Sequence, residues 1–431
     1  MSAVPEPARS VRDDFVADLG FPPDRFQARA FDVVDAGHSV LVAVPTGAGK
    51  TVVAEYGVAQ ALARGEKAFY TTPIKALSNQ KYGDFVRRYG EDRVGLLTGD
   101  NAINGSAPIV VMTTEVLRNM IYEASPALDR LGVVVLDEVH YLQDPYRGAV
   151  WEEVIIHLDP EVRLVCLSAT VSNAEEFGDW IRTVRGGTEV VIDDRRPVEL
   201  QHLYGVALRH EERLMLLPTF VADDQGRMVP NPDGSRFDPA GPMRSRRPGP
   251  DRRRRPAAAV PPRRVDVIEE LERRAMLPAI YFLFSRAGCD EAVRQCLSAH
   301  VRLTRDEEAR AIRTIADRHC EGLSDADLDV LGYRTWITGL EAGVAAHHAG
   351  MVPPMKEAVE ECFAAGLVKA VFATETLALG VNMPARSVII ERLTKFTGER
   401  HEMLTPGEYT QLTGRAGRRG IDDIGYGIVL W

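Results

Sequence analysis

The stretch that most constrains the fold runs from Val44 to Thr51, with the sequence Val-Pro-Thr-Gly-Ala-Gly-Lys-Thr. It follows an apolar run, Ser39 to Ala43, and precedes a helix-patterned run, Val52 to Leu62. A strand that leads into a glycine loop and then a helix forms a cradle for phosphate, because backbone N–H groups and the helix N-terminus point at the anion. Valine occupies the first position of the motif, where the general pattern has glycine, so a simple glycine-rich turn is the alternative.

Each part of this loop has a predicted role. The two glycines allow the backbone N–H groups to turn inward, Lys50 can reach the β- and γ-phosphates, and the Thr51 hydroxyl can hold Mg²⁺. Lys50 is also a candidate catalytic residue. The predicted nucleotide-binding residues of the loop are Thr46, Gly47, Ala48, Gly49, Lys50 and Thr51.

Downstream of the loop, apolar β-branched runs alternate with amphipathic runs. The predicted strands are Lys67 to Thr72, Ile109 to Met112 and Leu131 to Leu136, and the predicted helices are Ala76 to Tyr89 and Thr114 to Glu123. This alternation predicts an α/β fold, in which a parallel sheet is covered by helices on both faces. Ligands of such sheets bind at the carboxyl ends of the strands, so the polar clusters found there should line one edge.

An Asp-Glu-Val-His cluster follows the buried-strand run Leu131 to Leu136 directly. Asp137 would hold Mg²⁺ through water, and Glu138 would orient or deprotonate an attacking water. His140 could couple this site to the neighbouring Ser168-Ala169-Thr170. The alternative is an acidic, solvated turn, but the phosphate loop upstream favours the catalytic interpretation.

Gln27 lies some two dozen residues before Lys50, at the start of a helical pattern. Its amide could pair with both the donor and the acceptor edge of adenine. The residue taken alone fits better with a glutamine on the surface of a helix.

The amino-acid composition of the chain changes after about residue 205. From Gly205 to Arg264 there are 13 Lys/Arg against 7 Asp/Glu, although the whole chain has a net charge of −10. Asp223 to Pro262 is rich in Pro, Gly and Arg and should be disordered or loosely held. Its run Arg252 to Arg255 is either a basic arm for nucleic-acid phosphates or part of a solubilising linker. We predict a disordered tail over residues 1–14, a first domain over 15–205 and a linker or insertion over 206–264.

A second alternation of helices and strands predicts another α/β domain over residues 265–431, without a phosphate loop. Arg415 and Arg418 lie three residues apart. On one helical turn they would share a face and could reach a γ-phosphate presented by the other domain. The alternative is a pair of solvated arginines or contacts to a phosphate backbone. The helices between Arg302 and Leu340 have no predicted role.

The composition restricts the class of protein. Hydrophobic residues make up 45% and charged residues 26% of the chain, and no apolar run reaches the length of a membrane span. The five cysteines are scattered and form no CxxC pair, so neither a disulfide framework nor a zinc site is indicated. We expect a cytoplasmic protein with reduced thiols and no membrane partner.

The order of these clusters resembles that of the superfamily-two DExH helicases. The clusters are Gln27, Val44 to Thr51, Thr72 to Gln80, Asp137 to His140, Ser168 to Thr170, Thr374 to Pro384 and Gln411 to Gly420. Within this superfamily, the sequence of several clusters looks like that of the superkiller (Ski-like) RNA helicases and, among bacteria, of the HelY type. The resemblance implies two tandem RecA-like domains that use ATP and Mg²⁺.

The resemblance also implies individual roles. Gln27 would bind adenine, Ser168 and Thr170 would couple hydrolysis to strand movement, and Gly380 and Asn382 would face the nucleotide. Gln411, Arg415 and Arg418 would complete the catalytic site across the domain interface. The residues implied to contact the nucleic-acid strand are Thr72, Lys75, Thr114, Ser285, Arg286 and Thr376.

From these features we expect an ATP-dependent motor that moves on single-stranded or 3′-tailed RNA, with the 3′-to-5′ direction implied by the resemblance alone. A DNA repair helicase and an ATP-gated RNA clamp without unwinding activity are the alternatives. We expect a monomer, with RNA-decay nucleases as partners. Full-length relatives continue into winged-helix and ratchet domains, so we expect this chain to be an isolated motor core that separates long duplexes poorly.

Overall fold

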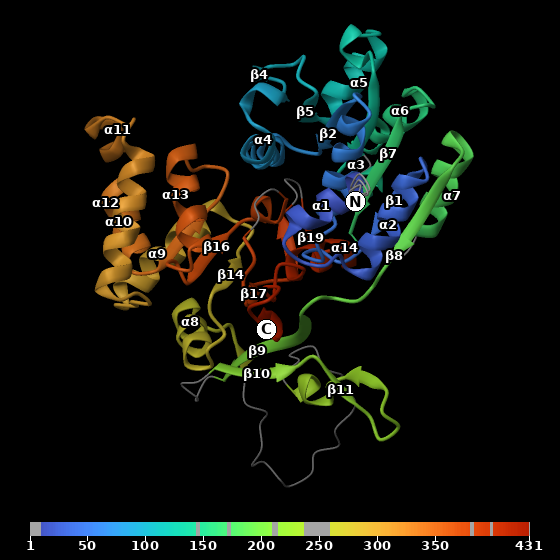
Figure 1. Cartoon of the computed structure of the whole chain (residues 1–431). Coiled ribbons are helices and arrows are strands. Elements are labelled where there is room, and N and C mark those ends of the chain that lie inside the picture. The colour runs from blue at the N-terminus through green and yellow to red at the C-terminus, as the bar shows by residue number, and fades with distance from the viewer. Residues whose placement is uncertain are drawn as a thin grey trace, which may run out of the picture. The chain divides into compact units, whose positions relative to one another are not determined.

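The computed structural model describes residues 10–143, 147–169, 174–208, 214–236, 259–379, 383–396 and 400–430. The chain forms two compact units, Met1–Arg196 and Pro197–Trp431. Each unit is built on a mostly parallel sheet flanked by helices (Figure 1). The predicted α/β class with two tandem RecA-like domains is therefore confirmed.

The first sheet has the strand order β4-β3-β5-β2-β6-β7-β1-β8. Neighbouring strands are parallel except for β3 and β4, which pair antiparallel at one edge. The strands are β1 (Ser39–Ala43), β2 (Lys67–Thr72), β3 (Val94–Leu97), β4 (Ala102–Ile103), β5 (Ile109–Thr113), β6 (Leu131–Leu136), β7 (Arg163–Ser168) and β8 (Thr188–Ile192).

Helices cover both faces of this sheet because apolar side chains of its central strands point to both sides, most clearly in β6. Along β6, Val133 and Val135 belong to the core cluster under the first four helices, whereas Val134 and Leu136 belong to the cluster under the next three. The helices are α1 (Val11–Leu19), α2 (Arg25–Asp35), α3 (Thr51–Ala63), α4 (Lys75–Tyr89), α5 (Thr114–Tyr122), α6 (Gly148–His157) and α7 (Ala174–Arg185). Three short 3-10 turns are η1 (Glu91–Arg93), η2 (Pro126–Leu128) and η3 (Val139–Gln143).

The second sheet has the order β10-β9-β20-β17-β14-β16-β15, and β13 also pairs with β9. From β9 to β15 all neighbours are parallel, whereas β10 and β13 run antiparallel to β9. The strands are β9 (Glu199–Leu208), β10 (Leu214–Pro218), β13 (Ala259–Val260), β14 (Ala279–Phe282), β15 (Val344–His347), β16 (Ala370–Ala373), β17 (Ser387–Ile390) and β20 (Ile424–Leu430).

The helices of the second unit also divide between two faces. The core of one face includes α8 (Arg264–Arg273) and α9 (Arg286–Ser298). The other includes α10 (Asp306–Cys320), α12 (Tyr333–Glu341), α13 (Pro353–Ala364) and α14 (Pro406–Thr413). The remaining elements are α11 (Asp325–Val330), η4 (Pro232–Arg236), η5 (Glu375–Leu379) and the hairpins β11 (Phe220–Ala222) with β12 (Met228–Pro230) and β18 (Thr394–Phe396) with β19 (His401–Met403). The helices without a predicted role thus contribute to the core, since Ile312 of α10 and Leu340 of α12 are fully buried.

The boundary between the units differs from the expected position. Residues up to 205 were expected in the first domain, and residues 206–264 were expected to form a linker. In the structure, residues 199–205 of β9 instead pair with β20 of the second sheet, from Glu199 with Ile424 to Gly205 with Leu430. Leu214 and Leu216 of β10 are also buried, so much of the expected linker is packed structure. The pairing partner lies more than 200 residues away, which local pattern cannot predict. The arginine run 252–255 lies outside the described residues.

The remaining expectations concern membrane spans and thiols. Among the described residues, no helix combines the length and the apolar character needed to cross a membrane. All five cysteines are free and buried. Burial raises the pKa of the Cys166 and Cys362 thiols to about 12, so these groups stay protonated and unreactive at neutral pH.

Candidate functional site

The phosphate loop has the predicted strand-loop-helix geometry. All five residues of β1 are buried between β7 and β8, and α3 begins at Thr51 directly after the loop. Gly47 has φ +82° and Gly49 has φ +92°, a region that residues with a side chain adopt only at a cost. The two glycines are therefore required by the path of the backbone.

Lys50 and Glu138, predicted separately, are in contact. Lys50 is 8% exposed, and its Nζ donates a hydrogen bond of 2.6 Å to Oε2 of Glu138. Glu138 itself has φ +51°, which is uncommon for a residue other than glycine and is typical of functional sites. The group predicted to hold phosphate and the group predicted to handle water thus meet at the carboxyl edge of the first sheet.

Asp137 is held on both carboxylate oxygens. Tyr70 Oη donates to Oδ2 at 2.7 Å, and the backbone N–H of Glu138 donates to Oδ1 at 2.9 Å. Burial raises the pKa of Asp137, and the neighbouring Glu138 adds to this effect, while Lys50 and Tyr70 oppose it. Sequence did not single out Tyr70, because an aromatic residue in an apolar strand is typical of a core position.

These oxygen groups suit Mg²⁺. A hydroxyl at Thr51 and a buried carboxylate at Asp137 are hard ligands, and the described residues contain no cluster of three or more His, Cys, Asp or Glu side chains. Mg²⁺ keeps several waters and is bound by one or two carboxylates together with substrate phosphates, rather than by a cage of protein ligands. The side chains present therefore fit this ion.

His140 lies with its Nδ1 3.4 Å from Oε2 of Glu138. Burial lowers the pKa of His140 more than the Glu138 charge raises it, which favours the neutral imidazole. Ser168 is also buried, and its backbone carbonyl accepts a hydrogen bond from Val44. Thr170 lies outside the described residues, so the coupling of His140 to Ser168 and Thr170 stays a prediction.

Gln27 is fully buried, so a surface position for this glutamine is wrong. Its Nε2 donates to the carbonyl of Gly49 at 2.9 Å, and its Oε1 accepts from the N–H of Asp24 at 2.8 Å. The side chain thus links the start of α2 to the phosphate loop. Binding of adenine by this amide stays a prediction.

The predicted nucleic-acid contacts of the first unit separate into two groups. The Thr72 hydroxyl bonds to that of Ser78 at 2.7 Å, and the Thr114 hydroxyl donates to the Thr72 carbonyl, so both side chains point into the protein. Contact through these two hydroxyls does not fit the structure, because Thr72 at the end of β2 and Thr114 at the start of α5 both point inward. Lys75 is exposed and forms an ion pair of 2.7 Å with Asp100.

In the second unit, the predicted contacts lie at element starts. Ser285 and Arg286 are exposed where α9 begins, and the Ser285 hydroxyl caps that helix by accepting from the N–H of Gly288. Thr376 is exposed in η5, with its hydroxyl 2.9 Å from that of Thr374. Gly380 and Asn382 lie outside the described residues.

The two predicted arginine fingers do not share a helical turn. Helix α14 contains Gln411 but ends at Thr413, so Arg415 and Arg418 both follow it. The chain leaves the helix because Ala416 forms a bridge with Ala385, and Gly417 has φ +88°. The expected helical geometry is therefore wrong.

Arg418 is instead oriented by an acidic residue that the sequence analysis missed. Its Nε and Nη2 donate to the two carboxylate oxygens of Asp422 at 2.7 and 2.8 Å. The Asp422 side chain is only 3% exposed. Burial opposes ionisation of Asp422, but the hydrogen bonds from Arg418 lower its pKa overall. This side-on pair leaves the Nη1 end of the guanidinium outside the contact.

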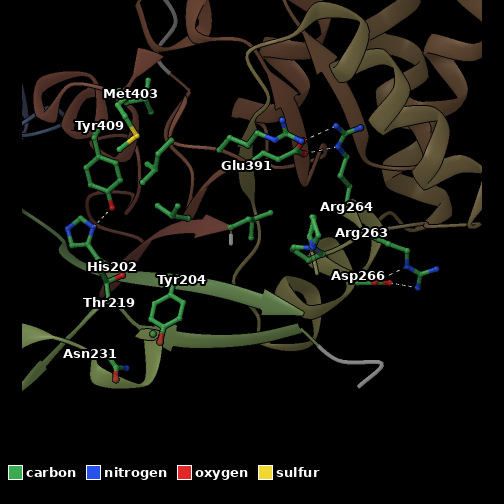
Figure 2. A pocket seen from close by; sticks show the side chains of 18 of the residues that line it. His202, Tyr204, Thr219, Asn231, Arg263, Arg264, Asp266, Glu391, Met403 and Tyr409 are labelled. Carbon is green, nitrogen blue, oxygen red and sulfur yellow. Dashed lines mark hydrogen bonds and ion pairs between the residues drawn. The ribbon is translucent and has the colours of Figure 1, made fainter. Parts of the chain in front are cut away.

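A cavity of about 1650 Å³ lies elsewhere in the second unit (Figure 2). On its wall His202 of β9 hydrogen-bonds to the hydroxyl of Tyr409 at 2.7 Å, which ties α14 to the sheet. Arg264 and Glu391, also on the wall, form a bidentate ion pair. None of the predicted site residues is among the described residues that line this cavity, so we assign it no part in the candidate site.

Comparisons with known proteins agree with this geometry. Residues 24–177 match the DEAD/DEAH box helicase family, and residues 325–420 match the helicase conserved C-terminal domain. The chain is 56% identical to the probable helicase HelY of Mycobacterium tuberculosis. The matched region covers 97% of this chain and 46% of the HelY sequence. It is 39% identical to human superkiller complex protein 2, covering 99% of this chain and 35% of that protein.

Human exosome RNA helicase MTR4 is 38% identical over 94% of this chain and 38% of its own length. The chain thus spans less than half the length of these curated relatives. Both helicase domains are nevertheless matched, in the two units where the phosphate loop and the arginine cluster lie. The chain belongs to the superkiller (Ski2-like) family of superfamily-two DExH-box helicases.

Proposed function

We propose that this chain is an ATP-hydrolysing motor that moves along single-stranded RNA, in the 3′-to-5′ direction, and uses this movement to separate duplexes. The observation that carries the proposal is the contact between Lys50 and Glu138, beside the doubly held carboxylate of Asp137. A phosphate-binding lysine, a metal-binding carboxylate and a carboxylate for the attacking water are the groups that phosphoryl transfer requires. When bound, Mg²⁺ would neutralise charge on the phosphates.

The residues of the first unit have distinct roles in this proposal. Lys50 and the N–H groups of the loop hold the phosphates, and Glu138 leaves Lys50 to orient and deprotonate water when phosphate takes its place. The Nδ1 of His140 lies 3.4 Å from Glu138, and burial lowers the pKa of this imidazole, which favours a neutral neighbour that leaves the charge of the carboxylate intact. Arg415 and Arg418 of the second unit would stabilise charge that develops in the transition state.

Contact with RNA would rest mainly on the backbone of the protein. Helix α5 begins directly after β5, and α4 and α9 begin a few residues after β2 and β14, all at the carboxyl edge of their sheets. Helix N-termini bind phosphate through their N–H groups and their dipoles, and phosphate contacts hold a strand without selecting its sequence. Lys75 and Arg286 add exposed positive charge at two of these helix starts.

The names of the relatives favour RNA as the track, since human MTR4 is described as an exosome RNA helicase. The test compares steady-state ATPase rates with poly-ribonucleotide and poly-deoxyribonucleotide strands, followed by displacement of duplexes with 3′ or 5′ tails. We expect stimulation by RNA and displacement from 3′ tails. Stimulation by DNA alone would identify a DNA motor, and ATP-dependent RNA affinity without displacement would identify a clamp.

A further inference from the structure

The hydroxyl of Tyr70 is placed to orient the carboxylate that the proposed function assigns to Mg²⁺. Tyr70 is fully buried in β2, and its Oη donates to Asp137 Oδ2 at 2.7 Å. The ring is held in turn by Phe85 of α4, with the two ring centroids 5.5 Å apart in an edge-to-face arrangement. The donor therefore comes from a rigid part of the core.

The second oxygen of Asp137 is fixed independently. The N–H of Glu138 donates to Oδ1 at 2.9 Å, and the N–H of Asp137 donates to the Thr71 carbonyl at 3.0 Å. The backbone and both carboxylate oxygens are thus held from two neighbouring strands. Removing the tyrosine hydroxyl would leave Oδ1 bound but allow the carboxylate plane to rotate.

The chemical nature of the donor matters as well as its place. A lysine or arginine at this position would also bond to Asp137, but its positive charge would weaken the attraction of the carboxylate for a cation. The neutral phenol of Tyr70 orients the carboxylate and leaves its negative charge intact. Groups that hold a metal-binding side chain in this way commonly change metal affinity by about 10- to 100-fold.

We propose that Tyr70 is a positioning residue for the metal site, acting on Mg²⁺ through Asp137. The proposal rests on the proposed function, because it takes Asp137 as the metal-binding carboxylate. It goes beyond the sequence motifs of the family match, since Tyr70 lies outside the loop, the acidic cluster and the arginine cluster. Its effect should appear in metal affinity and leave metal-free nucleotide binding unchanged.

The test uses the full 431-residue chain carrying Tyr70→Phe, which removes one oxygen and keeps the ring. The chain offers a matched control in Tyr56→Phe. Tyr56 is also fully buried in the first unit, and its hydroxyl also bonds to a carboxylate, that of Asp35, away from the candidate site. Tyr56→Phe loses the bond to Asp35 and also the bond that the hydroxyl accepts from Gln60, so it removes at least as many hydrogen bonds as Tyr70→Phe.

Metal binding is measured with Mn²⁺ and ADP by electron paramagnetic resonance, which reports the bound ion without turnover. We expect Tyr70→Phe to weaken Mn²⁺ binding in the ADP complex by about 10- to 100-fold. Binding of a fluorescent ADP analogue in EDTA should match wild type. The Mg²⁺ concentration for half-maximal ATPase should rise by a similar factor, and Tyr56→Phe should leave all three quantities unchanged.

The outcomes separate this proposal from the proposed function. Wild-type protein that binds no Mn²⁺ with ADP would overturn both, whereas wild-type metal affinity in Tyr70→Phe would overturn only the role of Tyr70. Equal losses in the two tyrosine variants would show a general effect of buried hydrogen bonds and would also overturn it. If Tyr70→Phe does not fold, p-aminophenylalanine at position 70 supplies another neutral donor and should retain metal affinity; failure to do so in folded protein would contradict the proposal.

Discussion

Each unit holds one proposed catalytic cation in an ion pair, but the two pairs differ in what the partner does. In the first unit Lys50 contacts Glu138, and both belong to the proposed hydrolytic machinery. In the second unit Arg418 is bound by Asp422, which has no proposed contact with the reacting groups. Replacing Glu138 therefore changes chemistry, whereas replacing Asp422 should change only the orientation of the arginine.

The largest effect should come from Lys50→Ala. It removes the cation that holds the β- and γ-phosphates and leaves Glu138 without its ion pair, so we expect loss of measurable ATPase activity and weaker ATP binding. Lys67→Ala is a suitable control, because the Lys67 ammonium bonds to the carbonyl of Ala127 away from the loop. Near-normal turnover in Lys50→Ala would remove the first ion pair from the mechanism.

Glu138→Gln separates binding from turnover. The amide retains the shape of the carboxylate but is a poor base, so we expect kcat to fall by about 10³- to 10⁴-fold while ATP affinity is retained or increases. Single-turnover hydrolysis and equilibrium binding of ATP measure the two quantities. If the variant and the wild type hydrolysed ATP at comparable rates, Glu138 would only be a structural partner of Lys50.

Arg418→Ala tests the second unit. We expect kcat to fall by about 10³-fold with little change in ATP affinity, because an arginine finger acts on charge that develops in the transition state. This change also leaves the buried Asp422 with only the weaker contact to Arg386, at 3.9 Å, which destabilises the fold. The double variant Arg418→Ala with Asp422→Asn removes both charges and should show the same kcat in a more stable protein. A loss below tenfold would direct attention to Arg415.

Asp422→Asn should have the smallest effect on turnover, about tenfold in kcat, because it loosens the orientation of Arg418 without removing it. A fall in kcat as large as that of Arg418→Ala would contradict the distinction between the two pairs.

The Asp422→Asn variant should also change the stability of the fold in acid. The pKa of Asp422 is lowered in the folded state, so its pair stabilises the fold above the unfolded value of about 3.9 and this contribution is lost as pH falls below it. Melting temperatures at pH 7 and pH 3 should therefore differ less in the variant than in wild type.

The sequence was most informative where a function depends on consecutive residues. The loop from Val44 to Thr51 and the cluster Asp137 to His140 each follow a buried strand, so the pattern of that strand places them at a sheet edge. Because the strands are parallel, their carboxyl ends meet at one edge of the sheet, and this brings Lys50 to Glu138. That arrangement can be expected from the general rules for connections and ligand sites in α/β sheets.

Contacts that depend on the partner of a strand or a turn could not be predicted in this way. Tyr70 reaches Asp137 only through the register between β2 and β6, and β9 joins the second sheet through β20. Arg418 reaches Asp422 because α14 ends at Thr413, before either arginine. The spacing of the arginines and glycines in the sequence does not show where that helix ends. The buried hydroxyls of Thr72 and Thr114 show the same limit, since motif membership does not determine which way a side chain points.

The position of β20 has a consequence for how the protein is made. This strand lies between β9 and β17, so the first strand of the second unit and its antiparallel partner β10 are cut off from the rest of their sheet until residues 424–430 are available. On the ribosome, the first unit can complete its sheet while the edge of β9 that pairs with β20 still lacks its partner. Translation through the second unit is thus the interval in which one edge of β9 stays open to chaperones and to misassembly.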